Sequence, residues 1–177
     1  MLVVNNVLLR VVSNDIERGS LRIPEGVTTI GERAFAYCTG LVHVEIPGSV
    51  RTIGDSAFYG CTGLTTLVIP EKVTTIGYEA FAHCAGLTQL EIPDSVTTIG
   101  EGAFHGCENV ATIVLFSNSN PTRLQEQLQS LFSKAVIETV QPLLSKSSGK
   151  RPSLFDQGDE SGKEASISQA ASTPSPK

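Results

Sequence analysis

The sequence lacks any apolar run long enough to cross a membrane as a helix. A helical span needs about 20 apolar residues, and the 177 residues contain no such run. The chain also has no tryptophan and a single methionine. The first residues, MLVVNNVLLRVV, have no basic flank and are interrupted by Asn5, Asn6 and Arg10, so they make a poor secretory signal. We therefore expect no membrane span and no signal peptide. The predicted location is the cytoplasm, or outside the cell by a route that needs no such signal.

Basic residues are scarce in the first two thirds of the chain. Residues 1–116 carry six Lys/Arg against twelve Asp/Glu, whereas residues 117–177 carry seven against six. A surface that follows nucleic-acid phosphates needs clustered basic side chains. The acidic balance therefore argues against nucleic acid as a partner.

One pattern of 23 residues fills the middle of the chain four times. The copies begin at Ile23, Ile46, Ile69 and Ile92 and keep their register without a gap. Proline, phenylalanine and cysteine recur once in each copy, at Pro24, Pro47, Pro70 and Pro93, at Phe35, Phe58, Phe81 and Phe104, and at Cys38, Cys61, Cys84 and Cys107. Such a period indicates a unit that cannot bury its own apolar face, so that neighbouring units must stack. The sequence predicts a solenoid.

Each copy predicts two short strands and one helical turn. In LVHVEI and its counterparts, apolar residues at the first, fourth and sixth places indicate a strand with alternate side chains inward. The proline that follows ends the strand, and the β-branched VTTIG favours a second one. The Ala-Phe-x-x-Cys spacing within residues 32–38 predicts a helical turn that faces the core. The expected fold class is an α/β repeat solenoid with columns of phenylalanine, isoleucine and cysteine.

The repeated pattern L-x-x-L-x-I-P-x-x-V-T-T-I-G-x-x-A-F-x-x-C-x-x-L resembles the BspA-type leucine-rich repeat over residues 23–115. The resemblance implies a leucine-rich-repeat stack with the first strand of each repeat on the concave side, where partners commonly bind. It also implies a binding role, since proteins with these repeats are often surface or secreted factors that bind other proteins. If the chain leaves its cell, a host- or surface-directed binding factor is implied.

Residues 1–22 predict an N-terminal cap for the four repeats, which occupy residues 23–116. Asn5 and Asn6 favour the turn of a small hairpin, and SLRIP resembles the strand end of a repeat. A cap is expected because the first repeat would otherwise expose an apolar underside and an unpaired strand edge.

Residues 117–146 predict a C-terminal cap helix. Thr122 and Gln125 have the spacing of a capping box, and an apolar stripe follows them. A helix that closes the stack is favoured over an amphipathic helix held free for a partner. Residues 147–177 are rich in Ser, Gly, Pro, Lys and Glu and predict a disordered tail.

The cysteine and histidine positions argue against a metal site. One cysteine per repeat places successive sulfur atoms about 4.8 Å apart in a row, whereas zinc needs its ligands around one point. Parallel Cβ vectors along the row would strain a disulfide, so we expect four buried free thiols. His43, His83 and His105 fall at different phases of the repeat. We therefore predict no histidine column, no metal and no cofactor.

Gly54, Asp55 and Ser56 spell the start of a hydrolase nucleophile motif. No His or Asp is spaced to form a relay with them, and no glycine-rich phosphate loop is present. The corresponding positions of the other copies vary, with Glu32-Arg33, Tyr78-Glu79 and Glu101-Gly102. We predict no catalytic residue and no enzymatic activity.

The outward positions of the first strands are the candidate binding residues. They form two rows, His43, Thr66, Gln89 and Thr112 in one and Arg22, Glu45, Val68, Glu91 and Val114 in the other. A solvated surface without a partner is the alternative for these rows. The favoured hypothesis is a non-enzymatic, monomeric module that binds a protein partner through the concave face. The alternative function is a structural scaffold whose disordered tail carries the partner motif.

Overall fold

The computed structural model describes residues 1–116, 122–132 and 134–140. The predicted disordered tail of residues 147–177 lies outside the described residues. Among the described residues, no helix is both long and apolar enough to pass through a bilayer.

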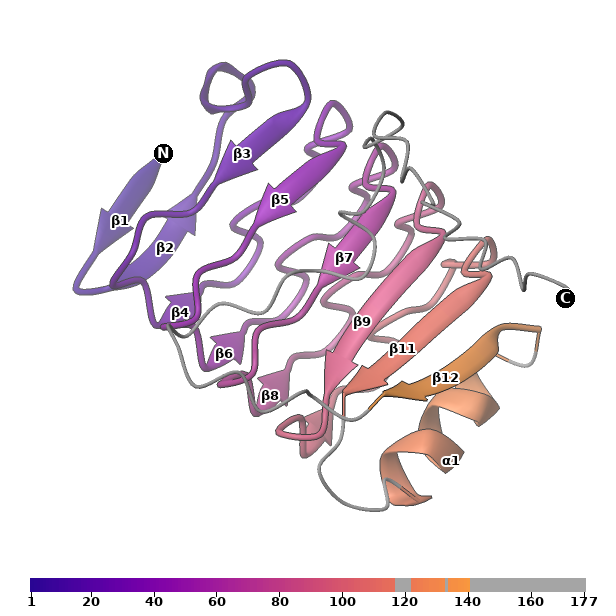
Figure 1. Ribbon diagram of the computed structural model, residues 1–177. Coiled ribbons are helices and arrows are strands. Elements are labelled where there is room, and N and C mark those ends of the chain that lie inside the picture. Colours follow the sequence, from indigo (N-terminus) through magenta and orange to yellow (C-terminus); the bar gives the residue numbers. More distant parts are fainter. Residues whose placement is uncertain (117–121, 133, 141–177) are drawn as a thin grey trace, which may run out of the picture.

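The first predicted strand of each repeat is present, and these strands lie side by side along one face of a stack (Figure 1). They are β5 (His43–Glu45), β7 (Thr66–Val68), β9 (Gln89–Pro93) and β11 (Thr112–Phe116), with β3 (Ser20–Arg22) before the four repeats and β12 (Val136–Val140) after them. All their pairings are parallel: β3 with β5, and β7, β9, β11 and β12 in a four-stranded sheet. We call the outward side of these strands the long-strand face. The predicted strand stack is confirmed.

The VTTIG segments form the predicted second strands. They are β4 (Thr29–Ile30), β6 (Thr52–Ile53), β8 (Thr75–Ile76) and β10 (Thr98–Ile99). Together with β1 (Leu2–Val4) and β2 (Val7–Arg10) they make a six-stranded sheet in the order β1-β2-β4-β6-β8-β10. In each of these short strands the threonine faces outward and the isoleucine faces the core.

The N-terminal hairpin is also confirmed. β1 and β2 pair antiparallel, and the two residues between them, Asn5 and Asn6, have φ of 49° and 63°. Positive φ at both central residues is the requirement of the turn that suits a two-residue hairpin loop, and asparagine tolerates it. β2 then pairs in parallel with β4 and buries Leu8 completely, so the hairpin covers the first repeat. A short 3-10 helix, η1 (Ser13–Asp15), leads from there to β3.

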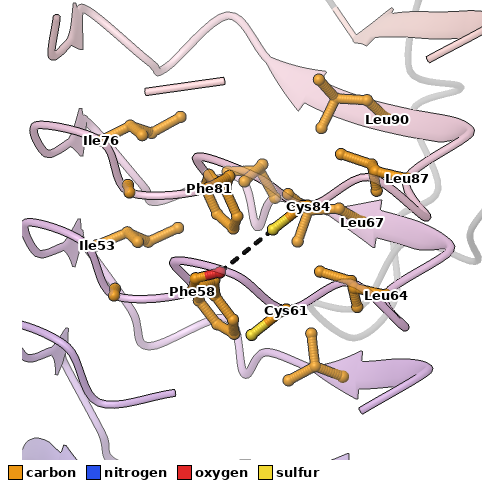
Figure 2. Close-up of a cluster of buried hydrophobic side chains, with 14 of the residues drawn as sticks. Ile53, Phe58, Cys61, Leu64, Leu67, Ile76, Phe81, Cys84, Leu87 and Leu90 are labelled. Carbon is orange, nitrogen blue, oxygen red and sulfur yellow. Dashed lines mark hydrogen bonds between the residues drawn. The ribbon is translucent and has the colours of Figure 1, made fainter. Parts of the chain in front are cut away.

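A column of phenylalanine rings runs through the core. Phe35, Phe58, Phe81 and Phe104 stack with centroids 4.4, 5.1 and 5.4 Å apart and planes within 12° of parallel. Figure 2 shows Phe58 and Phe81 between isoleucines on one side and leucines on the other, one set per repeat. The three rings of Phe35, Phe58 and Phe81 have no exposed surface. Each repeat therefore depends on its neighbours for its core, as predicted.

The predicted helical turn in each repeat is wrong, because the backbone there bonds between repeats. The Arg33 N–H donates to the Asp55 carbonyl of the next repeat (3.0 Å), whereas the following Ala34 N–H donates to the Gly31 carbonyl of its own repeat (3.3 Å). This alternation continues to Cys38 and recurs in the second and third copies. Half of the N–H groups in the segment thus tie one repeat to the next, which a helix would not allow.

Backbone dihedrals give the same result. Two positions in every copy have positive φ. The first is occupied by Arg33, Ser56, Glu79 and Gly102, and the second by Tyr37, Gly60, His83 and Gly106. A right-handed helix cannot accommodate such residues. Each copy therefore has a run of tight turns, which we call the turn segments (residues 32–38, 55–61, 78–84 and 101–107).

The predicted cap helix over residues 117–146 is corrected as well. The structure has a short helix, α1 (Thr122–Leu131), followed by β12, which pairs with β11 over its full length. Leu128 of α1 is buried, and the Phe132 ring lies 5.5 Å from that of Phe104. The end of the stack beyond β11 is thus a further strand with a helix beside it (Figure 1), because the β-branched VIETV fits a parallel neighbour of β11 better than a helix.

Three of the four cysteines are buried as predicted, and their thiols also donate hydrogen bonds. Cys61, Cys84 and Cys107 each point to the phenylalanine carbonyl of the preceding repeat at 3.1 to 3.2 Å, and Figure 2 shows the bond from Cys84 to Phe58. Cys38, in the first of the four copies, is half-buried. All four are free thiols. Burial raises the pKa of Cys61 to about 12, and a smaller burial raises that of Cys38.

We expect Cys38 to be the first thiol to react in the native protein. A thiol reacts as its thiolate, and both burial and the raised pKa oppose thiolate formation more strongly at Cys61 than at Cys38. Labelling with a disulfide reagent at mildly alkaline pH should modify Cys38 in the native state and all four cysteines after denaturation. The Cys38→Ser variant should remove nearly all native labelling. Native labelling of Cys61, Cys84 and Cys107 at the rate of Cys38 would contradict the buried column.

Candidate functional site

The candidate binding residues lie on the long-strand face in two rows. Strand register places Thr66 opposite Gln89 and Gln89 opposite Thr112. One step along the strands, it places Arg22 opposite Glu45, Val68 opposite Glu91 and Glu91 opposite Val114. Both rows follow from the alternation of side chains along a strand, which puts every second residue on the same side of a sheet.

Exposure differs along these rows. His43 and Arg22 are exposed, and Glu45, Thr66, Val68, Gln89 and Thr112 are half-buried. Glu91 and Val114 are only 2% exposed. The accessible part of the face over the repeats is therefore the first row together with Arg22, Glu45 and Val68 of the second.

Arg22 and Glu45 form a two-pronged ion pair across β3 and β5. The guanidinium Nε and Nη2 donate to the two carboxylate oxygens at 2.5 and 2.9 Å. These hydrogen bonds raise the pKa of Arg22. The pair neutralises the charge of Glu45, so this carboxylate does not act as an isolated negative group on the face.

Both rows continue onto β12, which lies in the segment predicted to be a cap helix. Val136 pairs with Thr112 and Glu138 pairs with Val114, and both side chains are exposed. The β-branched composition of VIETV is the signal that could have revealed them. The long-strand face is thus one strand wider than predicted.

The expectation of no histidine column is wrong in part. The rings of His83 and His105 lie 5.3 Å apart in an edge-to-face contact, on turn segments rather than on the long-strand face. His43 lies apart from them on β5. Within the described parts of the chain, no group of three or more His, Cys, Asp or Glu side chains is placed to hold a metal ion.

Solved structures with a similar architecture include three bacterial leucine-rich repeat proteins. A leucine-rich cell surface protein from Faecalibacterium prausnitzii is 30% identical, with a TM-score of 0.61 over 75% of this chain. Leucine-rich repeat proteins from Bacteroides ovatus (26% identity, TM-score 0.55, 69% of this chain) and Eubacterium ventriosum (30%, 0.52, 56%) are also similar. The matched part spans 35%, 36% and 27% of those three chains, respectively. No curated protein matches.

The family model described as the BspA type leucine-rich repeat region matches residues 13–139 in six copies. The match covers most of the chain and extends beyond the four copies read from the sequence, over β3 at one end and β12 at the other. The chain belongs to the family of BspA type leucine-rich repeat proteins.

Proposed function

We propose that this protein is a non-enzymatic module that binds a protein partner through its long-strand face. The observation that supports the proposal most is the matched register of outward side chains from β3 to β5 and from β7 through β9 and β11 to β12. Stacked repeats offer such an extended surface instead of a deep pocket, and an extended surface suits a macromolecule. Leucine-rich repeat proteins commonly mediate contacts between proteins, which agrees with this role.

The partner surface that fits this face is polar rather than strongly basic. Glu45 is already paired with Arg22, and Glu91 is buried. Within the repeats, the accessible groups of the first row are an imidazole, two hydroxyls and an amide, which donate and accept hydrogen bonds. Binding over the repeats should therefore depend only weakly on salt, since screening acts mainly on exposed charges, and salt should act mainly on contacts with the exposed Glu138 of β12.

The size of the face limits the interface. Strands spaced about 4.8 Å apart make a patch about 20 Å long over the repeats. Such a patch suits an interface at the small end for specific complexes, below about 1,600 Å² in total. Because the Faecalibacterium relative is named a cell surface protein, we extend the proposal to a surface-directed binding factor.

A charged side chain in the centre of the face should abolish much of the binding. We expect Thr66→Arg to weaken the complex on the order of tenfold, because a buried unpaired charge at an interface is costly. Thr75→Arg is the matched control, since Thr75 is also a half-buried strand threonine but lies on β8. The partner is captured on the immobilised full chain, identified by mass spectrometry and titrated calorimetrically against both variants. Equal binding by the two variants would contradict the proposal.

Removal of residues 147–177 separates this function from the scaffold alternative. A partner held by the long-strand face stays bound to the shortened chain, whereas a partner held by the tail is lost. Loss of binding in the shortened chain, with Thr66→Arg binding normally, would show that the repeats only carry the tail.

A further inference from the structure

Four aromatic side chains form a continuous row across the turn segments. The rings of Tyr37, Tyr59, His83 and His105 contact each other edge to face, with centroids 5.4, 5.2 and 5.3 Å apart. Tyr37 is 70% exposed, His83 and His105 are exposed, and Tyr59 is half-buried. We call these four residues the ring row. It lies outside the core, because the turn segments direct Phe and Cys inward.

The ring row crosses two different phases of the repeat. Tyr37 and His83 follow their phenylalanine by two residues, whereas Tyr59 and His105 follow theirs by one. In the second and fourth copies, glycine replaces the side chain that would otherwise intervene. A Cβ at Gly60 would lie 2.9 Å from the Tyr37 ring, and one at Gly106 would lie 2.8 Å from His83 Nδ1. The two glycines thus make room for the ring of the preceding repeat.

The turn segments hold a large share of the chain's polar aromatic residues. The chain has three tyrosines and three histidines, and the turn segments contain all three tyrosines and two of the histidines. Tyrosine is enriched in interfaces and among the residues that contribute most to binding. Exposed rings placed in a row therefore mark a surface suited to a partner.

The charge around the ring row is negative. Within the four turn segments the acidic residues outnumber the basic ones, with Arg33 against Glu32, Asp55, Glu79 and Glu101. Glu79 hydrogen bonds with Tyr78 and raises its pKa, and the nearby charge of Glu101 and the Tyr59 phenol add to the effect. A Cβ at Gly102 would contact both Glu79 Cγ (3.2 Å) and His105 Cβ (3.9 Å), so this carboxylate side chain flanks the ring row.

We propose that the ring row and its flanking carboxylates are a second binding surface, which takes an arginine- or lysine-bearing segment of a protein. Aromatic rings attract a cation placed over their faces, and the carboxylates accept its N–H groups. A glycan fits this surface less well, because neighbouring rings meet at 68° to 87° and do not form the flat platform on which sugar rings stack. This surface is separate from the long-strand face.

Tyrosine emission reports on the turn segments, where Tyr37 and Tyr59 belong to the ring row and Tyr78 lies beside Glu79. The chain has no tryptophan, and its three tyrosines all lie on turn segments. A short capped peptide of alternating arginine and glycine, titrated into the full chain, should change the emission in a saturable way that high salt weakens. The matched peptide of glutamate and glycine should leave it unchanged. A change of emission with cellohexaose and none with the arginine peptide would overturn the proposal in favour of a glycan.

Histidine variants separate the ring row from general attraction to an acidic chain. His83→Ala and His105→Ala should each weaken binding of the fluorescein-labelled arginine peptide about three- to fivefold in an anisotropy titration. His43→Ala removes an exposed histidine of the long-strand face and should have no effect. Thermal unfolding checks whether each variant is folded. If a ring variant is not folded, the exposed Glu101→Gln replaces it, and this substitution should reduce the salt dependence of peptide binding. Equal affinity of the wild type, His83→Ala and Glu101→Gln would overturn the proposal.

Discussion

Phe58→Ala is expected to lower the free energy of unfolding by about 3–5 kcal/mol. The Phe58 ring is completely buried and stacks on Phe35 at 4.4 Å and on Phe81 at 5.1 Å. Its removal leaves a cavity that touches the repeats on both sides, and the regular backbone bonds between repeats oppose its collapse. Urea unfolding followed by circular dichroism measures the loss.

Phe104→Ala is the control at the end of the same column. Phe104 is 5% exposed and meets Phe132 at a tilt of 59° instead of a parallel stack. We expect a smaller loss there, because the α1 region can move toward the space. Equal and small losses for the two variants would show that the phenylalanine column is not the core of the stack.

Gly86→Ala is expected to destabilise the protein by about 2–3 kcal/mol. A Cβ at Gly86 would lie 2.3 Å from the Thr62 carbonyl oxygen and 3.2 Å from that of Leu64, both in the preceding repeat. These are backbone atoms held by the stack, so they cannot turn aside as a flexible side chain could. The same clash recurs at Gly63, where the Thr39 carbonyl would lie 2.4 Å away.

Gly40→Ala is the matched control, because Gly40 has the same phase in the first copy. The N-terminal cap precedes this copy, and a Cβ at Gly40 would meet nothing within 4 Å. The substitution should be neutral or stabilise by up to about 1 kcal/mol, since alanine restricts the unfolded chain. The fourth copy has Asn109 at this position. The hydrogen bond from the Val110 N–H to the Cys107 carbonyl is 3.5 Å long there, whereas the equivalent bond from Leu87 to Cys84, next to Gly86, is 3.0 Å long. Similar melting temperatures for Gly40→Ala and Gly86→Ala would contradict the steric account.

The columns of the core could be predicted because they depend only on period and polarity. A fixed interval of one repeat puts each phenylalanine over the next, and alternating apolar residues place the strands. The Asn5-Asn6 hairpin was readable for a similarly local reason, since asparagine accepts the positive φ that both positions have. These features need no knowledge of how the backbone bonds between repeats.

The turn segments could not be read in the same way. Ala-Phe-x-x-Cys has helical spacing, but Arg33 and Tyr37 adopt positive φ, which their residue types do not suggest. Only the glycines at the same phases of other copies, Gly60, Gly102 and Gly106, hint at it. The ring row was missed for the same reason. The change between negative and positive φ next to each Phe brings side chains from two different positions of the repeat into one row.

The burial of the side chains in the two binding rows also could not be predicted from the sequence. Alternation places Glu45 and Glu91 outward, yet one is paired with Arg22 and the other is 2% exposed. The apolar stripe over residues 117–146 was interpreted as one helix, although it covers both α1 and β12. Apolar spacing alone does not distinguish a short helix from a strand that follows it.

Site-specific photocrosslinking tests the long-strand face most directly. A benzoylphenylalanine at Gln89 faces outward on β9, and the same group at Thr75 lies on β8 of the same repeat. Both chains are incubated with the captured partner, irradiated and resolved on a denaturing gel. We expect a covalent complex from Gln89 and none from Thr75. Equal crosslinking from both positions, or crosslinking from Thr75 alone, would contradict it.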